Sequence, residues 1–123
     1  MKFRDHLARK TGGTLIITQS DREYAESNWQ RYGAVLGVNH QGAIHTTNMP
    51  HLHRPVADED TPSQEDIQAW VDFGVGALNS GRNLLIHCEA GQNRSVIMSS
   101  LIEALFDKRN WWEIVELYHN EML

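Results

Sequence analysis

The feature that most constrains this chain is a strand, loop and helix pattern in its last third. An apolar run at residues 84–87 leads into a polar loop that opens with Cys88 and closes with Arg94, and a second apolar run covers residues 96–106. The first run has the length of a buried strand and the second that of a helix. Backbone N–H groups of such a loop converge on an anion at the N-terminus of the helix. The pattern therefore predicts a phosphate-sized cup inside an α/β domain.

The residue types in this loop suit chemistry on a phosphate group. A thiol at a helix N-terminus beside a guanidinium ionises readily, and the thiolate is the nucleophilic form of cysteine. The planar fork of Arg94 matches two phosphate oxygens. A lone cysteine is more often a small buried hydrophobe. That interpretation leaves Gly91 in the middle of the loop and the cation of Arg94 unexplained.

The order His87-Cys88, five residues, Arg94-Ser95 resembles the signature of the cysteine-dependent protein tyrosine phosphatase superfamily, and the loop is most similar to its dual-specificity branch. The resemblance implies that Cys88 is the nucleophile and that the Ser95 hydroxyl bonds the thiolate and eases its departure. It implies that His87 supports the loop from behind. Together with Arg94, the residues implied to surround the substrate phosphate are Glu89, Ala90, Gly91, Gln92 and Asn93.

Expulsion of an alkoxide or phenoxide calls for a general acid, which typically contributes about 10²–10⁴-fold. The resemblance implies an aspartate on the loop before the helix that precedes the cysteine strand, about thirty residues upstream of the cysteine. Asp58 lies 30 positions before Cys88 and Asp60 lies 28 positions before it. We prefer Asp58, with Asp60 as the alternative. The plainer interpretation of both is solvated loop acids or charges at a helix N-terminus.

The remaining segments alternate between strand and helix signals. Residues 1–13 are polar and basic and are expected to form an arm, while residues 14–123 form the catalytic domain. The predicted strands cover 15–18, 34–39, 52–56 and 84–87. The predicted helices run from Ser20 with Glu23 to Gly33, from Thr61-Pro62 with Gln64 to Gly81, over 96–106, and from Asn110 with Glu113 to the end of the chain.

This alternation predicts a single α/β domain whose sheet has four to five mostly parallel strands and helices on both faces. The phosphate loop is expected between the central strand and a buried helix, because the run at 96–106 is apolar on all sides. Four histidines crowd one region, namely His40, His45, His51 and His53. No cysteine or close carboxylate completes a zinc site there, so we expect no metal and no cofactor.

Composition narrows the class of protein further. A chain of 123 residues makes one domain, and a net charge of −5 argues against a nucleic-acid or anionic-membrane partner. We find no apolar stretch of transmembrane length and no signal-peptide pattern at the N-terminus. One cysteine forms no internal disulfide, which suits a reducing compartment. These features lead us to expect a cytoplasmic monomer.

The sequence therefore predicts a phosphomonoester hydrolase that works through a cysteinyl-phosphate intermediate. A phosphorylated protein, on tyrosine or on serine and threonine, is the preferred substrate, and a small phosphorylated metabolite is second. Relatives that act on phosphoinositides or RNA 5′-phosphates tend to have basic loops, whereas this loop carries Glu89 and no lysine. Two alternatives from other classes are a phosphate-binding module without turnover and a rhodanese-like sulfurtransferase. The first would normally lose the nucleophile or the acid, and the second fits the His-Cys opening and Arg-Ser close less well.

Overall fold

A computed structural model describes residues 5–38, 42–56, 61–89 and 94–122. It contains a five-stranded sheet whose strand order is β1-β2-β5-β3-β4. Strands β2, β5, β3 and β4 are parallel, and β1 pairs antiparallel with β2 at one edge. The strands are β1 (His6–Lys10), β2 (Ile16–Ser20), β3 (Ala34–Gly37), β4 (His51–His53) and β5 (Leu84–His87).

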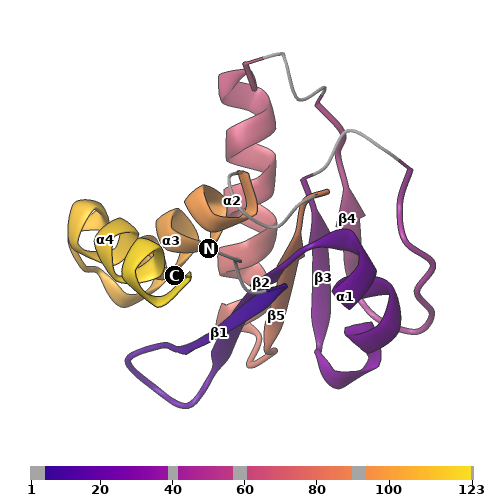
Figure 1. The fold of residues 1–123 in the computed structure, drawn as a ribbon, viewed down its shortest axis with the longest axis horizontal. Coiled ribbons are helices and arrows are strands. Elements are labelled where there is room, and N and C mark those ends of the chain that lie inside the picture. Colours follow the sequence, from indigo (N-terminus) through magenta and orange to yellow (C-terminus); the bar gives the residue numbers. More distant parts are fainter. Residues whose placement is uncertain (1–4, 39–41, 57–60, 90–93, 123) are drawn as a thin grey trace.

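The helices cover both faces of this sheet (Figure 1). In the described ranges they are α1 (Arg22–Asn28), the short 3₁₀ helix η1 (Trp29–Arg31), α2 (Gln64–Asn79), α3 (Arg94–Asp107) and α4 (Trp111–Met122). Helix α1 packs on one face with Val35 and Leu85, while α2 and α3 pack on the other face with Leu36 and Ile86. Helix α4 lies outermost, against α3 (Figure 1). The predicted fold class is confirmed.

The N-terminal segment differs from the predicted arm, because residues 6–10 form the edge strand β1. Leu7 is buried in a cluster with residues of α3 and α4. Arg9 makes two hydrogen bonds to the buried carboxylate of Glu103 in α3, each 3.0 Å long. A strand whose inward cation pairs with a buried acid lacks the apolar alternation from which strands are predicted. This pairing explains why the sequence suggested an arm.

Three predicted helix starts are wrong by one or two residues, and one of them is that of α3, which begins at Arg94 rather than at residue 96. Helix α1 is capped by Asp21, whose Oδ1 accepts the Tyr24 N–H at 2.8 Å, because Ser20 still belongs to β2. Helix α2 is capped by Ser63 in a reciprocal box with Asp66, rather than by Thr61 with Gln64. Serine, threonine and aspartate are all good N-cap residues, so the sequence alone does not decide which of several neighbouring candidates caps the helix.

The other predicted ends also shift, while the order of elements holds. Helix α1 ends at Asn28 and the 3₁₀ turn continues to Arg31, ahead of Gly33. Strand β3 ends at Gly37 rather than Asn39. Strand β4 covers 51–53 instead of 52–56. Gly81 follows the end of α2 with φ +79°, a conformation that glycine adopts without strain.

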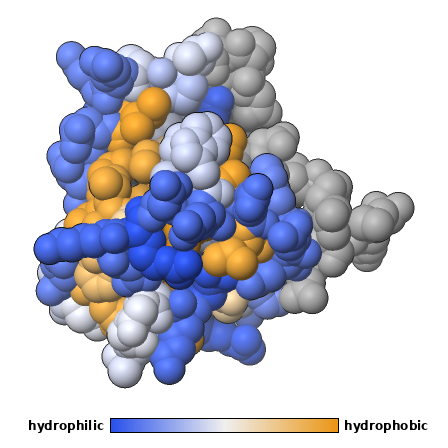
Figure 2. Space-filling model, turned by 90° about the vertical axis from the view of Figure 1, so that its left-hand side faces the viewer, coloured by the Kyte–Doolittle hydropathy of each residue, from blue (hydrophilic) through white to orange (hydrophobic). Residues whose placement is uncertain are grey.

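Helix α3 is central, as its apolar sequence predicts: Met98 and Ile102 are buried against the sheet and α2, while Val96 and Ala104 are buried against β1 and α4. Close contact with α2 depends on Gly74, where an added Cβ would lie 2.5 Å from Ile102 Cδ1. Ile97 and Leu105 are nevertheless 45% and 51% exposed, so the helix is not buried all round. Figure 2, which looks at the side of α3 and α4, shows apolar areas broken by hydrophilic side chains. Among the described residues, no helix is long and apolar enough to cross a membrane.

Candidate active site

The candidate site lies at the carboxyl end of β5, the central strand. Cys88 follows β5 directly and is 7% exposed. Its N–H donates to the Ser20 carbonyl at 3.3 Å, and the Val38 N–H donates to the His87 carbonyl at 2.9 Å. The backbone at Cys88 is therefore held between the ends of the two flanking parallel strands, β2 and β3. This is the edge of a parallel sheet where ligands bind in α/β folds.

A buried chain of hydrogen bonds leads away from the thiol. Cys88 Sγ donates to Ser95 Oγ at 3.1 Å, and Ser95 Oγ donates to Gln19 Oε1 at 2.9 Å. Ser95 and Gln19 are both completely buried. The structure thus brings together Cys88 and Ser95, which the sequence analysis pairs, and adds Gln19 of β2. The available sequence signal for Gln19 was an amide inside an otherwise β-branched and apolar strand, which must find a partner when buried.

Arg94 begins α3 and reaches back over the ends of two strands. Its Nη1 donates to the carbonyl of Val38, 3.1 Å away and just after β3, and to the carbonyl of Val56, downstream of β4. The guanidinium carbon lies 6.0 Å from the centre of the Trp70 ring in α2. These contacts hold the cation at the carboxyl edge of the sheet, the same edge that carries Cys88. A planar guanidinium in this place suits the binding of two phosphate oxygens.

His87 lies behind the loop, on the α1 side of the sheet, and is fully buried. Burial, reinforced by His51, His53 and Arg22 nearby, lowers the pKa of His87 to about 3. The ring is therefore neutral near pH 7 and is unsuited to proton transfer there. Gly37 makes room for it, because an added Cβ would lie 3.0 Å from His87 Nε2 and 2.8 Å from His53 Cδ2. This packing agrees with the supporting role that the sequence suggests for His87.

The histidine group does not assemble a metal centre in the part of the chain that the structure describes, where no cluster of three or more His, Cys, Asp or Glu side chains has the required geometry. His51 and His53 share a face of β4, and Thr46 Oγ1 lies 2.9 Å from His51 Nδ1. His45 is exposed. His40 lies outside the described residues. The expectation of no metal stays a prediction.

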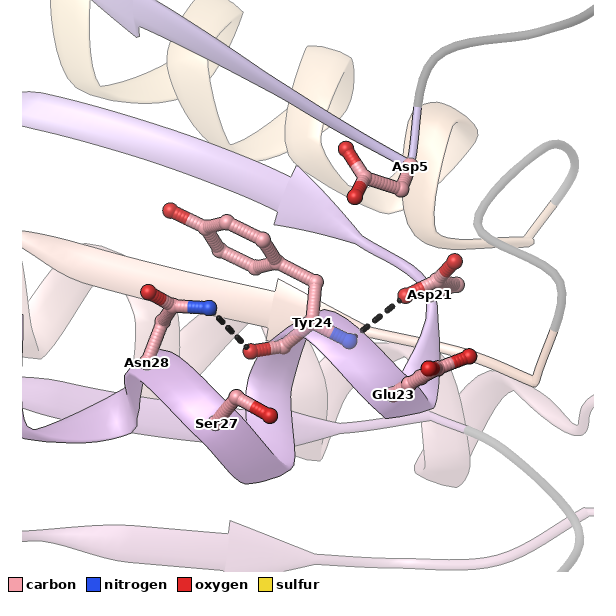
Figure 3. A pocket seen from close by; sticks show the side chains of 6 residues that line it. All are labelled: Asp5, Asp21, Glu23, Tyr24, Ser27 and Asn28. Carbon is pink, nitrogen blue, oxygen red and sulfur yellow. Dashed lines mark hydrogen bonds between the residues drawn. The ribbon is translucent and has the colours of Figure 1, made fainter.

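An acidic pocket of about 390 Å³ lies beside α1. Figure 3 shows Asp5, Asp21 and Glu23 around it, with Tyr24, Ser27 and Asn28 on the helix. The Arg22 N–H, between two of these acids, donates to the Glu89 carbonyl at 3.3 Å. The segment that carries Asp21 and Glu23 therefore contacts Glu89, the residue after Cys88, and three carboxylates line the pocket.

Several predicted site residues lie outside the described residues. They are Asp58 and its alternative Asp60, and the loop residues Ala90, Gly91, Gln92 and Asn93. Glu89 is described and is partly buried. The geometry on hand is thus a buried cysteine hydrogen-bonded to a serine hydroxyl, an arginine fixed at the same sheet edge, and a neutral histidine behind them.

Comparison with known proteins agrees with this arrangement. A family described as polymorphic toxin system, DSP-PTPase phosphatase, matches residues 13–104. The active form of Tk-PTP has a TM-score of 0.70 at 18% identity, over 92% of this chain and 82% of that chain. DUSP15 has a TM-score of 0.73 at 17% identity, over 85% of this chain and 70% of that chain.

A third structure, PTPMT1 in complex with PI(5)P, has a TM-score of 0.67 at 14% identity, over 85% of this chain and 77% of that chain. No curated protein matches the chain by sequence. At these identities the solved structures establish the fold, while the family match covers most of the chain. The chain belongs to the DSP-PTPase phosphatases of polymorphic toxin systems, and it is a cysteine-based phosphatase of the protein tyrosine phosphatase type.

Proposed function

We propose that the chain hydrolyses phosphomonoesters in two steps through a phosphocysteine at Cys88. The thiolate attacks phosphorus, the bond from phosphorus to the ester oxygen breaks, and its electrons leave with that oxygen. Water then attacks phosphorus, and the bond to sulfur breaks with its electrons returning to Cys88. Arg94 and the amides of the phosphate loop, residues 89–93, stabilise the phosphoryl oxygens. The observation that carries this proposal is the buried Cys88–Ser95 pair at the edge where Arg94 is fixed.

The proposed general acid is Asp58, which protonates the leaving oxygen and then, as a carboxylate, accepts a proton from the attacking water. Support comes from the chain just before it, since the Val56 carbonyl accepts a hydrogen bond from Arg94. Val56, which Arg94 contacts, is only two residues before Asp58 in the sequence, and Arg94 is the residue proposed to hold the phosphate. Asp60 lies two residues farther along and stays the alternative.

Replacing Asp58 should slow the enzyme most where the leaving group needs a proton. In Asp58→Asn we expect kcat to fall by about 10²–10³-fold for phenyl phosphate and by much less for aryl phosphates with acidic phenols. Asp60→Asn is the matched control and should leave that dependence unchanged. The measurement is kcat across a series of aryl phosphates. A steepened dependence in Asp60→Asn, with none in Asp58→Asn, would exchange the two assignments.

For the substrate we propose a phosphorylated segment of a protein, on tyrosine or on serine and threonine. The carboxylates of Asp5, Asp21 and Glu23 line a pocket on the segment that contacts Glu89, and the whole chain carries a charge of −5. A molecule with several phosphates is repelled by these charges, whereas one phosphate on a polypeptide brings neutral or basic neighbours with it. PTPMT1, a fold relative, was solved with PI(5)P, so phosphoinositides belong in the test.

A substrate panel should rank phosphopeptides first. We expect kcat/KM for phosphotyrosine or phosphothreonine peptides to exceed that for a sugar phosphate, a phosphoinositide or a 5′-phosphorylated RNA by about tenfold or more, equal to about 1.4 kcal/mol. Added salt should raise the rate with the polyanions because it screens the acidic side chains. A preference for the phosphoinositide at low salt would reject the phosphoprotein proposal and leave the reaction mechanism in place.

We also propose a cellular location and an oligomeric state for the chain. The described cysteine is a free thiol, and a phosphocysteine mechanism needs it reduced, which supports a reducing compartment such as the cytoplasm. We propose that the chain acts as a monomer, since the mechanism assigns roles to Cys88, Ser95 and Arg94, which a single domain supplies together. Size-exclusion chromatography with light scattering tests the second point.

A further inference from the structure

We propose that Gln19 is a positioning residue for this phosphatase, which holds the hydroxyl proton of Ser95 until the sulfur of Cys88 becomes negatively charged. The inference rests on the proposed cysteine mechanism and adds a residue that the phosphate loop does not contain. Gln19 lies on β2, 76 positions before Ser95 in sequence, and its side chain is completely buried.

The argument starts from the direction of the hydrogen bonds. Cys88 Sγ donates to Ser95 Oγ at 3.1 Å, and Ser95 Oγ donates to Gln19 Oε1 at 2.9 Å. A serine hydroxyl has one proton and two lone pairs, so it donates to one partner at a time. With the thiol protonated, both bonds form together, and the hydroxyl proton points at Gln19.

The thiolate reverses the demand on that proton. Once Cys88 has lost its proton, sulfur no longer donates, and it becomes an acceptor for the Ser95 hydroxyl. The hydroxyl serves it only by rotating away from Gln19, whose amide oxygen then loses this bond. Gln19 and the thiolate therefore compete for one proton. A hydrogen bond to a charged acceptor is about twice as strong as a neutral one, so the hydroxyl donates to the thiolate. The net stabilisation of the thiolate is smaller, because the bond to Gln19 is lost.

This competition fits the second chemical step. In the phosphocysteine the sulfur carries no charge and accepts weakly, so the Ser95 proton rests on Gln19 Oε1. When the bond between sulfur and phosphorus breaks, its electron pair goes to sulfur and the proton rotates onto it. No atom is gained or lost in this rotation. Gln19 thus keeps the hydroxyl oriented within the buried site, ready for each change of charge on Cys88.

The surroundings of Cys88 supply other charges that a titration must hold constant. They are Arg94 at the start of α3, His87 and Glu89 on either side in sequence, and Arg22 of α1, whose N–H contacts the Glu89 carbonyl. None of these is altered by a substitution at Gln19. The neighbouring Thr18 offers a control, because its buried hydroxyl has no hydrogen-bond partner among the described residues. Thr18 pairs with Leu85 of β5, and its side chain lies on the opposite face of the sheet from that of Gln19.

The test is the pH dependence of alkylation of Cys88 by iodoacetamide, which reports thiolate directly and needs no turnover. In Gln19→Met, of similar size but without an acceptor, the midpoint should move to lower pH by about one unit, the equivalent of about 1.4 kcal/mol. In Gln19→Glu it should move to higher pH by at least as much. Thr18→Val should leave it unchanged. In a Ser95→Ala background the effect of Gln19→Met should shrink to less than about 0.3 units if Gln19 acts through Ser95.

Three outcomes would overturn the inference. They are an unchanged midpoint in Gln19→Met, a shift to higher pH in that variant, and a shift that persists in the Ser95→Ala background. A purely structural role for Gln19 would lower the melting temperature without moving the midpoint. Alkylation is independent of phosphate release. If Gln19→Met retains turnover and its alkylation midpoint does not move, only the inference about Gln19 is rejected, and the proposed function stands. Lost turnover in a folded wild-type protein would reject the proposed function instead.

Discussion

Cys88→Ser is expected to reduce the hydrolysis of para-nitrophenyl phosphate by about 10⁴–10⁶-fold, the largest effect of any single substitution in this chain. A serine hydroxyl is not ionised near pH 7, so it is a poor nucleophile without a base. Its alkoxide would also be a poor leaving group in the second step. The measurement is kcat with the purified variant at saturating substrate.

The same variant should still bind oxyanions. Arg94 keeps its contacts with the Val38 and Val56 carbonyls, and a hydroxyl at position 88 can donate to Ser95 as the thiol does. Tungstate binding by calorimetry should therefore fall by less than about tenfold, which corresponds to 1.4 kcal/mol. Ser99→Ala, a buried hydroxyl on the same helix, is the control and should retain activity. Undiminished phosphate release in Cys88→Ser would reject the cysteine mechanism.

Acid should destabilise the fold through His87 well before the carboxylates are protonated. Burial, with His51, His53 and Arg22, lowers the pKa of His87 to about 3 from an ordinary value of 6.5. Between these values the unfolded chain binds a proton that the folded chain does not, so stability falls as the pH falls through this window. The free energy of unfolding should drop by up to about 1.4 kcal/mol per pH unit, or about 2.3 kcal/mol from pH 6.5 to 4.5, because half of the His87 rings in the unfolded chain are already protonated at pH 6.5.

Urea denaturation at several pH values checks this prediction, with His87→Gln as the comparison. The variant lacks the titrating group, so its free energy of unfolding should fall less steeply. His51, whose pKa is also lowered, contributes to both proteins. Asp66, whose pKa the Arg54 and Ser63 hydrogen bonds lower to about 2, loses its stabilising effect only below about pH 4. Equal slopes in wild type and His87→Gln between pH 6.5 and 4.5 would contradict a neutral, buried His87.

The sequence predicts the part of this protein whose pattern is local. The run at 84–87 forms the central strand β5, and the following apolar run forms α3. Both elements are determined by residues close together in the chain, so the spacing of apolar residues and the length of each run are enough to predict them. The pairing of Cys88 with Ser95 was implied by the resemblance to the phosphatase signature, and the structure places the two side chains 3.1 Å apart.

What the sequence does not predict depends on partners far away in the chain. The sequence of β1 suggests a polar arm, because the partner of Arg9 is Glu103, which lies 94 positions later in the chain. Gln19 gains its place in the site from Ser95, and Arg94 is held by two backbone carbonyls, which have no sequence signature. Helix starts are uncertain by a residue or two, because Ser20 and Asp21 both suit a cap and only the end of β2 decides between them.

The central claim is that the phosphoryl group passes through the sulfur of Cys88. The most direct measurement is mass spectrometry of the protein quenched by denaturation within the first turnover of para-nitrophenyl phosphate, in wild type and in Asp58→Asn. We predict about one phosphoryl group per chain on the peptide that carries Cys88, with a matching burst of para-nitrophenol. A phosphoryl group on any other residue, or phosphate released with none ever on Cys88, would contradict the mechanism.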